Sequence, residues 1–375
     1  MIQPKEFFDN LISEGILFFS GVPDSLLKNF CAYVTDHVDD RHHVIAANEG
    51  GAVALAAGYY LATGNYALVY MQNSGLGNAT NPLVSLADPE VYSIPMLLMI
   101  GWRGEPGIHD EPQHVKQGRV TLGLLEAMEI PYLVLDGNTR DWRGLVRSLC
   151  DQMRDHERPV AIVVRTDTFD EYKMGTFDDD SSLLMREEAI SIVVERIGDN
   201  DIVVSTTGKT SRELFEVRER YSQGHGRDFL TVGSMGHSSQ IALGIALQKP
   251  NYRVICLDGD GAVLMHAGAL AIVGQKAPPN FVHIVINNES HDSVGGQPTA
   301  SPNVDYVDFA QAMGYRNALR AATSKEIESA LAQLLDSEGP SLLEIKTRKG
   351  SRQDLGRPTI TPLENRNELM RRLLW

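Results

Sequence analysis

Several features that mark other protein classes are scarce in this chain of 375 residues. It has three cysteines, Cys31, Cys150 and Cys256, which form neither a CxxC pair nor a metal-ligand spacing. We therefore expect buried thiols in a reducing compartment, without a disulfide framework. No apolar run approaches the roughly 18 residues of a membrane span, and the first residues are typical of an amphipathic helix, unlike a signal peptide. These absences predict a cytoplasmic protein without a membrane partner.

Positive charge is also scarce. Lysine and arginine number 34 against 49 aspartates and glutamates, giving a formal net charge of −15. This balance argues against a nucleic-acid partner, which requires a basic face. It does not exclude a small anionic substrate, because a few local cations can dominate one cleft. Two phosphate-binding signatures are incomplete as well: residues 208–210 lack the earlier glycine of a P-loop, and residues 75–77 and 259–261 do not complete a dinucleotide fingerprint.

The chain instead shows a regular alternation of apolar strands and helices. Hydrophobic residues make up 43% of the sequence, which is enough to bury a large core. Strands are predicted over residues 16–22, 43–47, 66–72, 95–101, 131–137, 159–165, 201–206, 254–259, 281–287 and 341–347, and helices between them include 52–62 and 323–336. Continuously apolar strands separated by helices predict α/β domains with doubly wound parallel sheets, buried on both faces.

The chain divides into two similar halves. Residues 156–165 and 337–346 each place a proline-containing turn between a helix and a strand. A polar, acidic stretch separates the two series of strands and is typical of a linker. We expect a first domain over residues 1–172, a linker over 173–188 and a second domain over 189–375, with no room for a third domain.

The most informative motif is Gly259-Asp260-Gly261, followed further along by Asn287-Asn288. Each group comes directly after a predicted strand, and the carboxyl ends of parallel strands meet at one edge of a sheet, where ligands bind. Asp260 and Asn288 should therefore lie close together and offer the oxygen ligands that a hard divalent cation prefers. Gly261 allows the backbone to approach a phosphate closely, and the start of the next helix favours the anion.

This arrangement resembles the cofactor motif of the thiamine-diphosphate (ThDP) enzymes, which pair a pyrimidine-binding (PYR) domain with a pyrophosphate-binding (PP) domain. The resemblance implies ThDP and Mg²⁺ as cofactors, with the PYR domain first in this chain and the PP domain second. It implies that the metal ligands are Asp260, Asn288 and the carbonyl of Ser290. It further implies cofactor contacts from Gly208, Gly259, Asp260, Gly261, Ala262 and Asn288.

Two further segments carry the same resemblance. Glu49 stands at a strand end before a helix that starts with glycines, where the family has a glutamate that hydrogen-bonds the pyrimidine ring and activates the cofactor. Met235 takes the place of the apolar residue that wedges between the two cofactor rings, and the carbonyl of Gly233 would accept from the aminopyrimidine. The resemblance also implies a homo-oligomer in which each active site combines domains of two subunits.

Several stretches resemble, more narrowly, the phosphonopyruvate decarboxylase family. They are residues 20–27, 71–89, 101–114, 206–216, 287–299 and 354–359. The resemblance implies non-oxidative decarboxylation of 3-phosphonopyruvate to phosphonoacetaldehyde and CO₂ in phosphonate biosynthesis. Three alternatives stay open: a sulfopyruvate decarboxylase, a ThDP-dependent carboligase, and a ThDP-binding regulator without catalytic activity.

A 2-oxo acid with a second anionic group requires cations at its binding site. Arg103 follows a predicted strand, Lys209 lies in a glycine-containing loop, and Arg352 and Arg357 lie in the C-terminal tail. Ser25, at the start of a predicted helix, is a further donor to an anion. We expect these five residues to contact the substrate.

Decarboxylation also requires a group that protonates the product carbon. His109 and His291 are the first candidates for this catalytic role, because histidine titrates near neutral pH. His114 is a third histidine near the motifs. Asp24, Asp110 and Gln113 are weaker candidates. The proton relay of yeast-type pyruvate decarboxylase does not carry over, because its glutamate position is Val294 in this chain.

Overall fold

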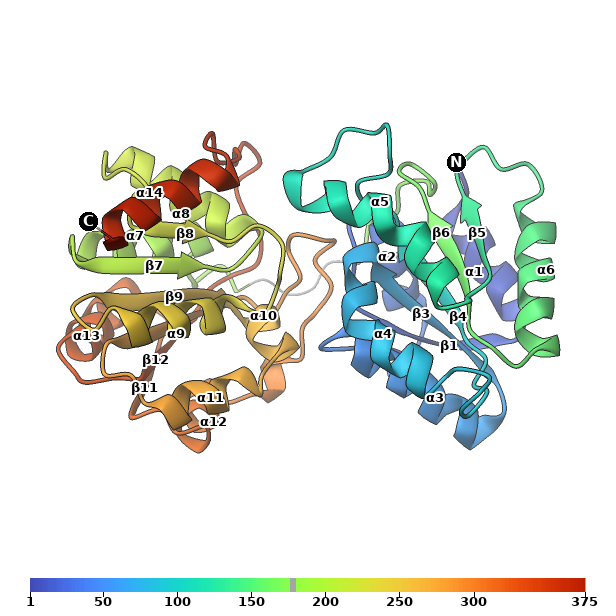
Figure 1. Cartoon of the computed structure of the whole chain (residues 1–375), viewed down its shortest axis with the longest axis horizontal. Helices are drawn as coiled ribbons and strands as arrows, with labels where there is room; N and C mark the ends of the chain where they lie inside the picture. Colours follow the sequence, from blue (N-terminus) through green and yellow to red (C-terminus); the bar gives the residue numbers. More distant parts are fainter. Residues whose placement is uncertain (176–179, 375) are drawn as a thin grey trace. The chain divides into compact units, whose positions relative to one another are not determined.

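The computed structural model describes residues 1–175 and 180–374. The chain forms two compact units, Met1–Phe177 and Asp178–Trp375 (Figure 1). Residues 176–179, within the expected linker, and residue 375 lie outside the described residues. In the described part of the chain, no helix is long and apolar enough to cross a membrane.

The first unit is built on a parallel sheet with the strand order β2-β1-β3-β4-β6-β5. Its strands are β1 (Ile16–Gly21), β2 (His43–Ile45), β3 (Tyr66–Gln72), β4 (Leu97–Gly101), β5 (Tyr132–Leu135) and β6 (Val160–Val164). One face packs on α1 (Pro4–Ser13), α2 (Lys28–His37) and α6 (Trp142–Asp155), and the other on α3 (Glu49–Thr63), α4 (Leu76–Ser85) and α5 (Pro112–Ala127). Because helices cover both faces, the central strands are apolar along their whole length.

The second unit repeats this plan with the strand order β11-β12-β10-β9-β7-β8. Its strands are β7 (Asp201–Ser205), β8 (Asp228–Leu230), β9 (Arg253–Gly259), β10 (Phe281–Asn287), β11 (Asn317–Ala321) and β12 (Ser341–Lys346). On one face lie α7 (Arg186–Arg196), α8 (Lys209–Arg220) and α13 (Ser324–Leu335), and on the other α9 (Ser238–Gln248), α10 (Asp260–Met265), α11 (Ala269–Lys276) and α12 (Tyr306–Ala312). The C-terminal helix α14 (Pro362–Leu374) follows.

The two sheets have the same connectivity. Read from β8, the second sheet runs β8-β7-β9-β10-β12-β11, which matches β2-β1-β3-β4-β6-β5 strand for strand. The sequence echo between residues 156–165 and 337–346 falls on the equivalent strands β6 and β12. Among the described residues, every pairing between the named strands is parallel, so the carboxyl ends of the strands in each unit share one edge. The chain reverses direction across the sheet between β1 and β3, and between β7 and β9, which are the places where ligands bind in such sheets.

The fold class predicted from the sequence is confirmed. All ten predicted strands are present, each within two residues of its predicted ends. Two strands that the sequence did not predict, β8 and β11, lie at the two edges of the second sheet. β8 has three residues and β11 carries an exposed arginine, so neither gives a continuous apolar signal. The three cysteines are free and buried, as expected.

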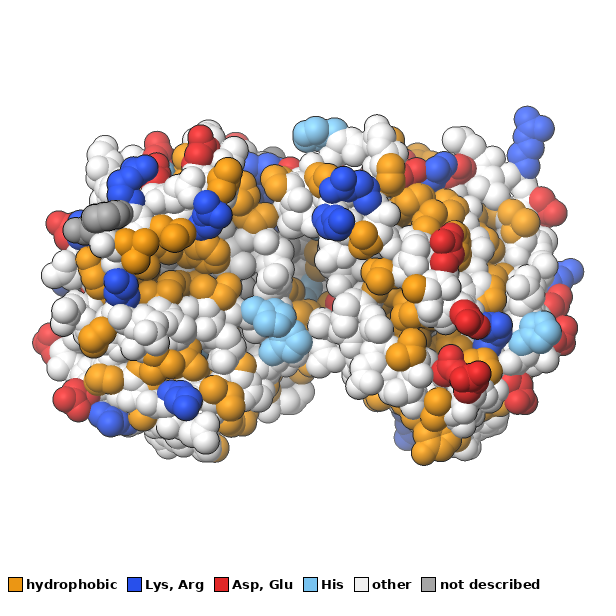
Figure 2. Space-filling model, viewed as in Figure 1, with side chains coloured by type: hydrophobic (Ala, Val, Ile, Leu, Met, Phe, Trp, Pro, Cys, Tyr) orange, Lys and Arg blue, Asp and Glu red, His pale blue; other side chains and the backbone are white. Residues whose placement is uncertain are grey.

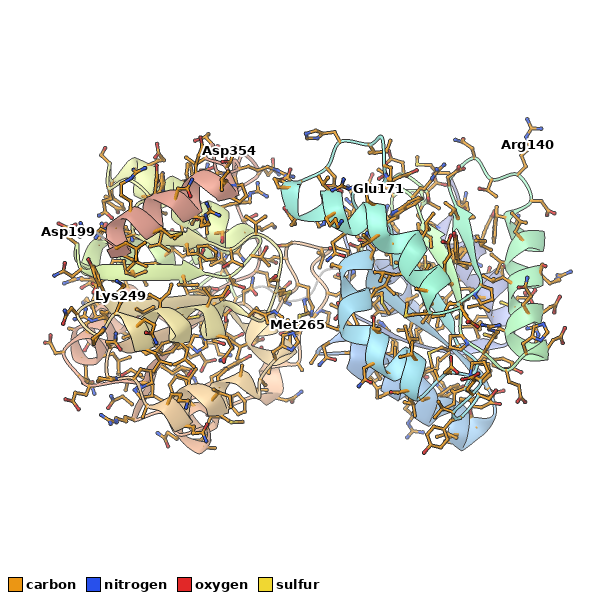
Figure 3. The ribbon with its side chains drawn as sticks, in the orientation of Figure 1. Arg140, Glu171, Asp199, Lys249, Met265 and Asp354 are labelled. Atoms are coloured by element: carbon orange, nitrogen blue, oxygen red, sulfur yellow. The ribbon has the colours of Figure 1, made fainter. Side chains whose placement is uncertain are left out.

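The C-terminal helix α14 completes the edge of the second sheet. Asn365 donates to the carbonyl of Asp228 at 2.8 Å and accepts from the amide of Leu230 at 2.9 Å, so it pairs the open edge of β8. Lys249, labelled in Figure 3, donates to the carbonyl of Leu373 and holds the end of the helix. Hydrophobic side chains remain at the surface on α9, α11 and α14, including Leu247, Ile272 and Met370 (Figure 2).

Candidate active site

Glu49 begins α3 at the carboxyl edge of the first sheet. Asn48 caps the helix by accepting from the amide of Gly51 at 2.8 Å, which fixes where the helix starts. The Glu49 side chain is buried, and its Oε2 accepts from Nδ2 of Asn78 at 2.7 Å. A Cβ atom on Gly75 would lie 2.5 Å from Cγ of Glu49, so the carboxylate occupies space that only glycine leaves open. The carboxylate is therefore held in one orientation between α3 and α4.

Ser25 and Arg103 meet at the same edge of the first sheet. Nη1 of Arg103 donates to Oγ of Ser25 at 2.8 Å, and its Nε donates to Oδ2 of Asp110 at 2.8 Å. Nη2 of Arg103 also donates to Asp110, so the pairing is bidentate. Although burial alone would raise it, hydrogen bonds from Arg103 and the Gly104 amide hold the pKa of Asp110 below its usual value. The structure thus joins two predicted substrate residues, but Asp110 already neutralises this cation.

Asp24 lies beside this cluster as a fully buried carboxyl group. Its Oδ1 accepts from Nε2 of Gln72 at 2.8 Å, and its Oδ2 accepts from the amide of Leu26 at 2.8 Å. Burial raises the pKa of Asp24, and these hydrogen bonds together with the charge of Arg103 oppose the shift. Asp24 is therefore a group that retains a proton at a higher pH than an exposed aspartate.

Two candidate histidines of the first unit, His109 and His114, differ in their surroundings. His109 is exposed in the loop before α5, whereas His114 is buried within that helix. Among the described residues, Nδ1 of His114 has no hydrogen-bond partner, while its Nε2 lies 3.3 Å from Nε2 of Gln113. Burial and the nearby charge of Arg103 lower the pKa of His114 to about 4, so the ring is neutral at pH 7.

Asp260 is the first residue of α10, directly after β9, at the carboxyl edge of the second sheet. It is 2% exposed, and its Oδ2 accepts from Oγ1 of Thr299 at 2.6 Å and from Oγ of Ser301 at 2.7 Å. Burial raises the pKa of Asp260, and these two hydroxyl groups oppose the shift. Gly259 ends β9 and precedes the helix, and Ala262 is buried within its first turn.

Asn288 and Ser290 follow β10, the neighbour of β9 in the sheet. Oδ1 of Asn288 accepts from the amide of Ser290 at 3.2 Å, and its Nδ2 donates to Oδ2 of Asp292 at 2.7 Å. Both residues are buried. As the sequence predicted, the turns that carry Asp260 and Asn288 leave adjacent parallel strands at one edge of the sheet.

Gly261 and His291 bring these two turns into contact. A Cβ atom on Gly261 would lie 3.2 Å from Cε1 of His291, which is tighter than most side-chain contacts. Burial lowers the pKa of His291 to about 4, and the charge of Asp292 only partly opposes the shift. His291 therefore packs as a neutral ring against the turn that the sequence assigned to a phosphate.

Lys209 starts α8, directly after Gly208, which caps the helix. Lys209 is half-buried, and its ammonium group makes no ion pair or hydrogen bond with the described part of the chain. Burial lowers the pKa of Lys209, while Asp292 raises it and Arg186 lowers it further. A partly desolvated cation without a partner gains free energy when an anion binds.

Met235 lies in the loop between β8 and α9. Gly233 and Gly236 take φ angles of 73° and 83°, in the left-handed region, and Ser234 between them takes 48°. The amide of Gly233 donates to Oγ1 of Thr207 at 2.9 Å, which connects this loop to the turn that precedes Lys209. The tight loop presents a half-buried Met235 at the carboxyl edge of the sheet.

The two tail arginines predicted to bind substrate, Arg352 and Arg357, lie in different settings. Nε of Arg352 donates to Oε2 of Glu187 at 2.8 Å, and its other nitrogens pair with Glu216 and with Asp354, which Figure 3 labels. Three carboxylates therefore already surround this cation. Arg357 lies exposed further along the tail.

A second cluster of metal-ligand residues lies inside the second sheet. Cys256, Asp258 and His283 are all buried, with their ligand atoms within 4.8 Å of one another. Nε2 of His283 lies 3.5 Å from Oδ2 of Asp258, and its Nδ1 lies 3.1 Å from the hydroxyl of Tyr315. A thiol and an imidazole are unlike the oxygen ligands that Mg²⁺ prefers, so this cluster is chemically distinct from the Asp260 turn.

Comparison with known proteins agrees with this geometry. The N-terminal TPP binding domain of thiamine pyrophosphate enzymes matches residues 5–123, and the C-terminal TPP binding domain of the same enzymes matches residues 206–345. The chain belongs to the thiamine pyrophosphate enzyme family.

Full-length relatives within the family are decarboxylases by name. Phosphonopyruvate decarboxylase of Streptomyces viridochromogenes is 36% identical over 97% of this chain and 93% of its own length. Phosphonopyruvate decarboxylase of Streptomyces hygroscopicus is 34% identical over 97% of this chain and 92% of its own. Sulfopyruvate decarboxylase of Methanosarcina acetivorans is 27% identical, covering 94% and 93%. The resemblance predicted from the motifs is confirmed.

The residues at the edge of the second sheet suit a bound ThDP and its metal ion. Buried hydroxyl groups without a hydrogen-bond partner among the described residues follow several strands: Thr206 after β7, Thr231 after β8, Ser290 after β10 and Thr347 after β12. Both amide atoms of the fully buried Gln297 also have no described partner. Buried polar atoms are nearly always paired, so this edge is built to meet a polar ligand. Asp260 and Asn288 add the oxygen ligands that a divalent metal requires.

Several supporting residues of the site were not predicted from the sequence. Asn78, Thr299, Ser301 and Asp292 hold the side chains of Glu49, Asp260 and Asn288 through hydrogen bonds. Asn78 lies 29 residues from Glu49, and Thr299 lies 39 residues from Asp260. Their sequence spacing carries no signal, because the contacts arise when strands that are distant in sequence become neighbours. Asp292 is only four residues from Asn288, so in this case the short spacing was a usable signal.

Proposed function

We propose that this protein is a ThDP- and Mg²⁺-dependent decarboxylase that converts 3-phosphonopyruvate to phosphonoacetaldehyde and CO₂ in phosphonate biosynthesis. The observation that carries the phosphonate assignment is the half-buried ammonium group of Lys209, which has no ion-pair partner among the described residues. The full-length relatives named phosphonopyruvate decarboxylase support the same substrate.

The cofactor is assigned to residues of both units. When bound, ThDP supplies the electron sink for loss of CO₂. Asp260, Asn288 and the carbonyl of Ser290 would hold Mg²⁺ against the diphosphate, beside Gly259, Gly261 and Ala262. Glu49, fixed by Asn78 and buried at the start of α3, would hold a proton at the pyrimidine ring. Met235 and Gly233 would contact the rings, and Gly208 the diphosphate.

The active site is proposed to combine the PYR unit of one subunit with the PP unit of another, so the working form is a homo-oligomer. Exposed apolar side chains support association between subunits. They include Leu61, which is 72% exposed, and Tyr92, which is 68% exposed. The number of subunits can be measured by light scattering of the cofactor-bound protein.

Lys209 would bind the phosphonate group of the substrate. Arg103 is neutralised by Asp110, and Arg352 is surrounded by carboxylates, so neither offers an unpaired charge. Ser25 and Arg103 would serve together as hydrogen-bond donors to an anion, and Arg357 stays a proposed contact from the tail. A phosphonate carries nearly two negative charges at neutral pH and a sulfonate one, so a half-buried cation favours the phosphonate.

Asp24 is the proposed holder of the proton that the product carbon receives. It is fully buried, and burial raises the pKa of its carboxyl group. His109 is exposed, which suits a proton donor in a closed site less well. His291 packs against Gly261 and would lie near the diphosphate. His114 is neutral and buried beside Arg103, where it would shape the substrate site.

The deciding experiment measures aldehyde formation from phosphonopyruvate, sulfopyruvate and pyruvate, each with and without ThDP and Mg²⁺. We expect turnover that requires both cofactors and is fastest, by kcat/KM, with phosphonopyruvate. A higher kcat/KM with sulfopyruvate would indicate the second candidate function, a sulfopyruvate decarboxylase, which the full-length relative of that name supports. Acetoin-type products would indicate a carboligase. ThDP binding without turnover of any substrate would indicate a regulator.

A further inference from the structure

Asp292 lies at the centre of a buried network next to the proposed metal site. Its Oδ2 accepts from Nδ2 of Asn288 at 2.7 Å, from Nη1 of Arg186 at 3.2 Å and from the amide of Gly350 at 3.0 Å. The side chain of Asp292 is 8% exposed. These three donors come from the turn after β10, from the start of α7 and from the C-terminal tail.

This contact decides which way the amide of Asn288 points. A carboxylate only accepts hydrogen bonds, so the atom of Asn288 that faces Asp292 has to be the nitrogen. The amide oxygen then lies on the opposite side, where it accepts from the amide of Ser290 at 3.2 Å. A carbonyl-type oxygen accepts at two positions, so a second position on Oδ1 is available for a cation. Rotation of the amide by half a turn would present nitrogen to the metal.

Arg186 keeps Asp292 in place. Its Nε and Nη2 donate to Oε2 and Oε1 of Glu213 at 2.6 and 3.0 Å, and its remaining nitrogen donates to Asp292. Arg186 is 6% exposed and Glu213 is 1% exposed. A guanidinium held bidentately has little rotational freedom. The orientation of Asn288 is therefore transmitted from α8 through Glu213, Arg186 and Asp292.

We propose that Asp292 is a positioning residue that turns the amide oxygen of Asn288 toward the metal ion of the Mg²⁺–ThDP site. This inference rests on the proposed function, because it concerns the cofactor of the same site. Groups that orient a metal ligand through a hydrogen bond typically change metal affinity 10- to 100-fold when removed. In this role Asp292 would act on the metal ion through Asn288 and would not bind the ion itself.

The test measures the affinity for Mg²⁺ by calorimetric titration at saturating ThDP, without substrate. In Asp292→Ala we expect the dissociation constant to rise about 10- to 100-fold. In Asp292→Asn the loss of Mg²⁺ affinity should be smaller, because an amide oxygen can still accept a hydrogen bond from Asn288. Glu289→Gln is the matched control. It removes a neighbouring carboxylate that pairs with Lys346 at 2.8 Å, whereas the side-chain amide of Asn288 bonds to Asp292 and Ser290, so the Mg²⁺ affinity of this variant should equal that of the wild type.

The Asp292→Ala substitution in an Asn288→Asp variant distinguishes an effect on the orientation of the metal ligand from an effect on folding. In Asn288→Asp, either side-chain oxygen can ligate the metal, so orientation by Asp292 is no longer needed and the two carboxylates repel each other. Asp292→Ala should then leave Mg²⁺ affinity unchanged or strengthen it, the opposite of its effect beside Asn288. A residue with only a structural role would weaken binding in both backgrounds. Thermal unfolding of each cofactor-free variant reports on the fold directly.

The outcomes are distinct. Wild-type affinity in Asp292→Ala, or an equal loss in both backgrounds, overturns the positioning role. Absence of Mg²⁺-dependent ThDP binding in the wild type overturns the proposed function itself. Weaker Mg²⁺ binding in Asp292→Ala, together with unchanged or stronger binding when the same substitution is made in Asn288→Asp, supports both the positioning role and the proposed function.

Discussion

Asn78 on α4 donates a hydrogen bond of 2.7 Å to the carboxylate of Glu49, the first residue of α3. The two residues come from consecutive helices on one face of the first sheet, and Gly75 leaves the space that the Glu49 side chain fills. The hydrogen bond from Asn78 is made to Oε2 of Glu49. The geometry suits a carboxylate that holds a proton on a cofactor ring.

Replacing Glu49 should separate catalysis from cofactor binding. In Glu49→Gln we expect kcat to fall about 10²- to 10⁴-fold, because the amide cannot exchange a proton. ThDP affinity should stay within a few-fold of wild type, because the diphosphate and metal contacts are unchanged. Steady-state kinetics and calorimetry measure the two quantities. Full activity in this variant would exclude the proposed role of Glu49.

Lys209 should control substrate affinity and not cofactor affinity. In Lys209→Met we expect the KM for phosphonopyruvate to rise about 10- to 100-fold, since a charge-assisted contact in a half-buried setting contributes about 1.5–3 kcal/mol. Lys209→Arg should recover part of the loss. The control is Lys325→Met, which removes an exposed lysine on α13 and should have no effect. An unchanged KM in Lys209→Met would remove Lys209 from the substrate site.

Asp24 should destabilise the folded protein at neutral pH. Because the folded-state pKa is raised by burial, the native state binds this proton more tightly than the unfolded state does. Stability is therefore lost as the pH rises from the ordinary aspartate pKa through the raised value. Asp24→Asn should be more stable than wild type at pH 8, and the difference should shrink as the pH is lowered. Urea unfolding at several pH values measures this, and a difference that grows toward low pH would contradict it.

The same Asp24→Asn variant tests the proposed proton holder. We expect its kcat for phosphonopyruvate to fall by at least 10²-fold while its stability rises, because the amide cannot supply a proton. His109→Gln is the comparison variant, since His109 is exposed and should retain most activity. A larger loss of kcat in His109→Gln than in Asp24→Asn would indicate that His109, and not Asp24, supplies the proton.

Arg218 and Asp228 should anchor the second unit without affecting catalysis. Both side chains are fully buried, and Nε and Nη2 of Arg218 donate to the two oxygens of Asp228 at 3.0 and 2.8 Å. Asp228→Asn should cost about 3–5 kcal/mol in the free energy of unfolding, because the arginine charge stays buried. Asp199→Asn, at an exposed aspartate labelled in Figure 3, should cost little. A loss below about 1 kcal/mol would show that the site relaxes or admits water.

The fold was largely predictable because its signal is local. Continuous apolar strands such as 97–101 and 160–164 are buried on both faces, and a strand in that position needs no polar alternation. β8 could not be predicted, because its three residues are stabilised at the edge by Asn365, which is 135 residues from its partner Leu230. Propensity carries no information about such a contact.

The sequence predicted those residues of the candidate site that come directly after a strand. Asp260 and Asn288 follow β9 and β10, and the strands are adjacent, as their order in an α/β sheet implies. The sequence did not predict which cationic side chains are already paired with carboxylates. Arg103, Lys209 and Arg352 look alike in sequence, yet Asp110 neutralises the first, carboxylates surround the third, and Lys209 lacks a partner among the described residues.

The sequence by itself determined the two repeated α/β units, the family, and the residues that come at the ends of the strands. These follow from periodicity and from residue types at fixed spacing, which are properties of short segments. The tertiary structure decided which side chains hold those residues and which charges are already paired. Asn78, Thr299 and Asp292 acquire their roles only when separate turns meet at the edge of a sheet. Hydrogen bonds and ion pairs form at distances near 3 Å, and the folded backbone alone brings distant residues that close.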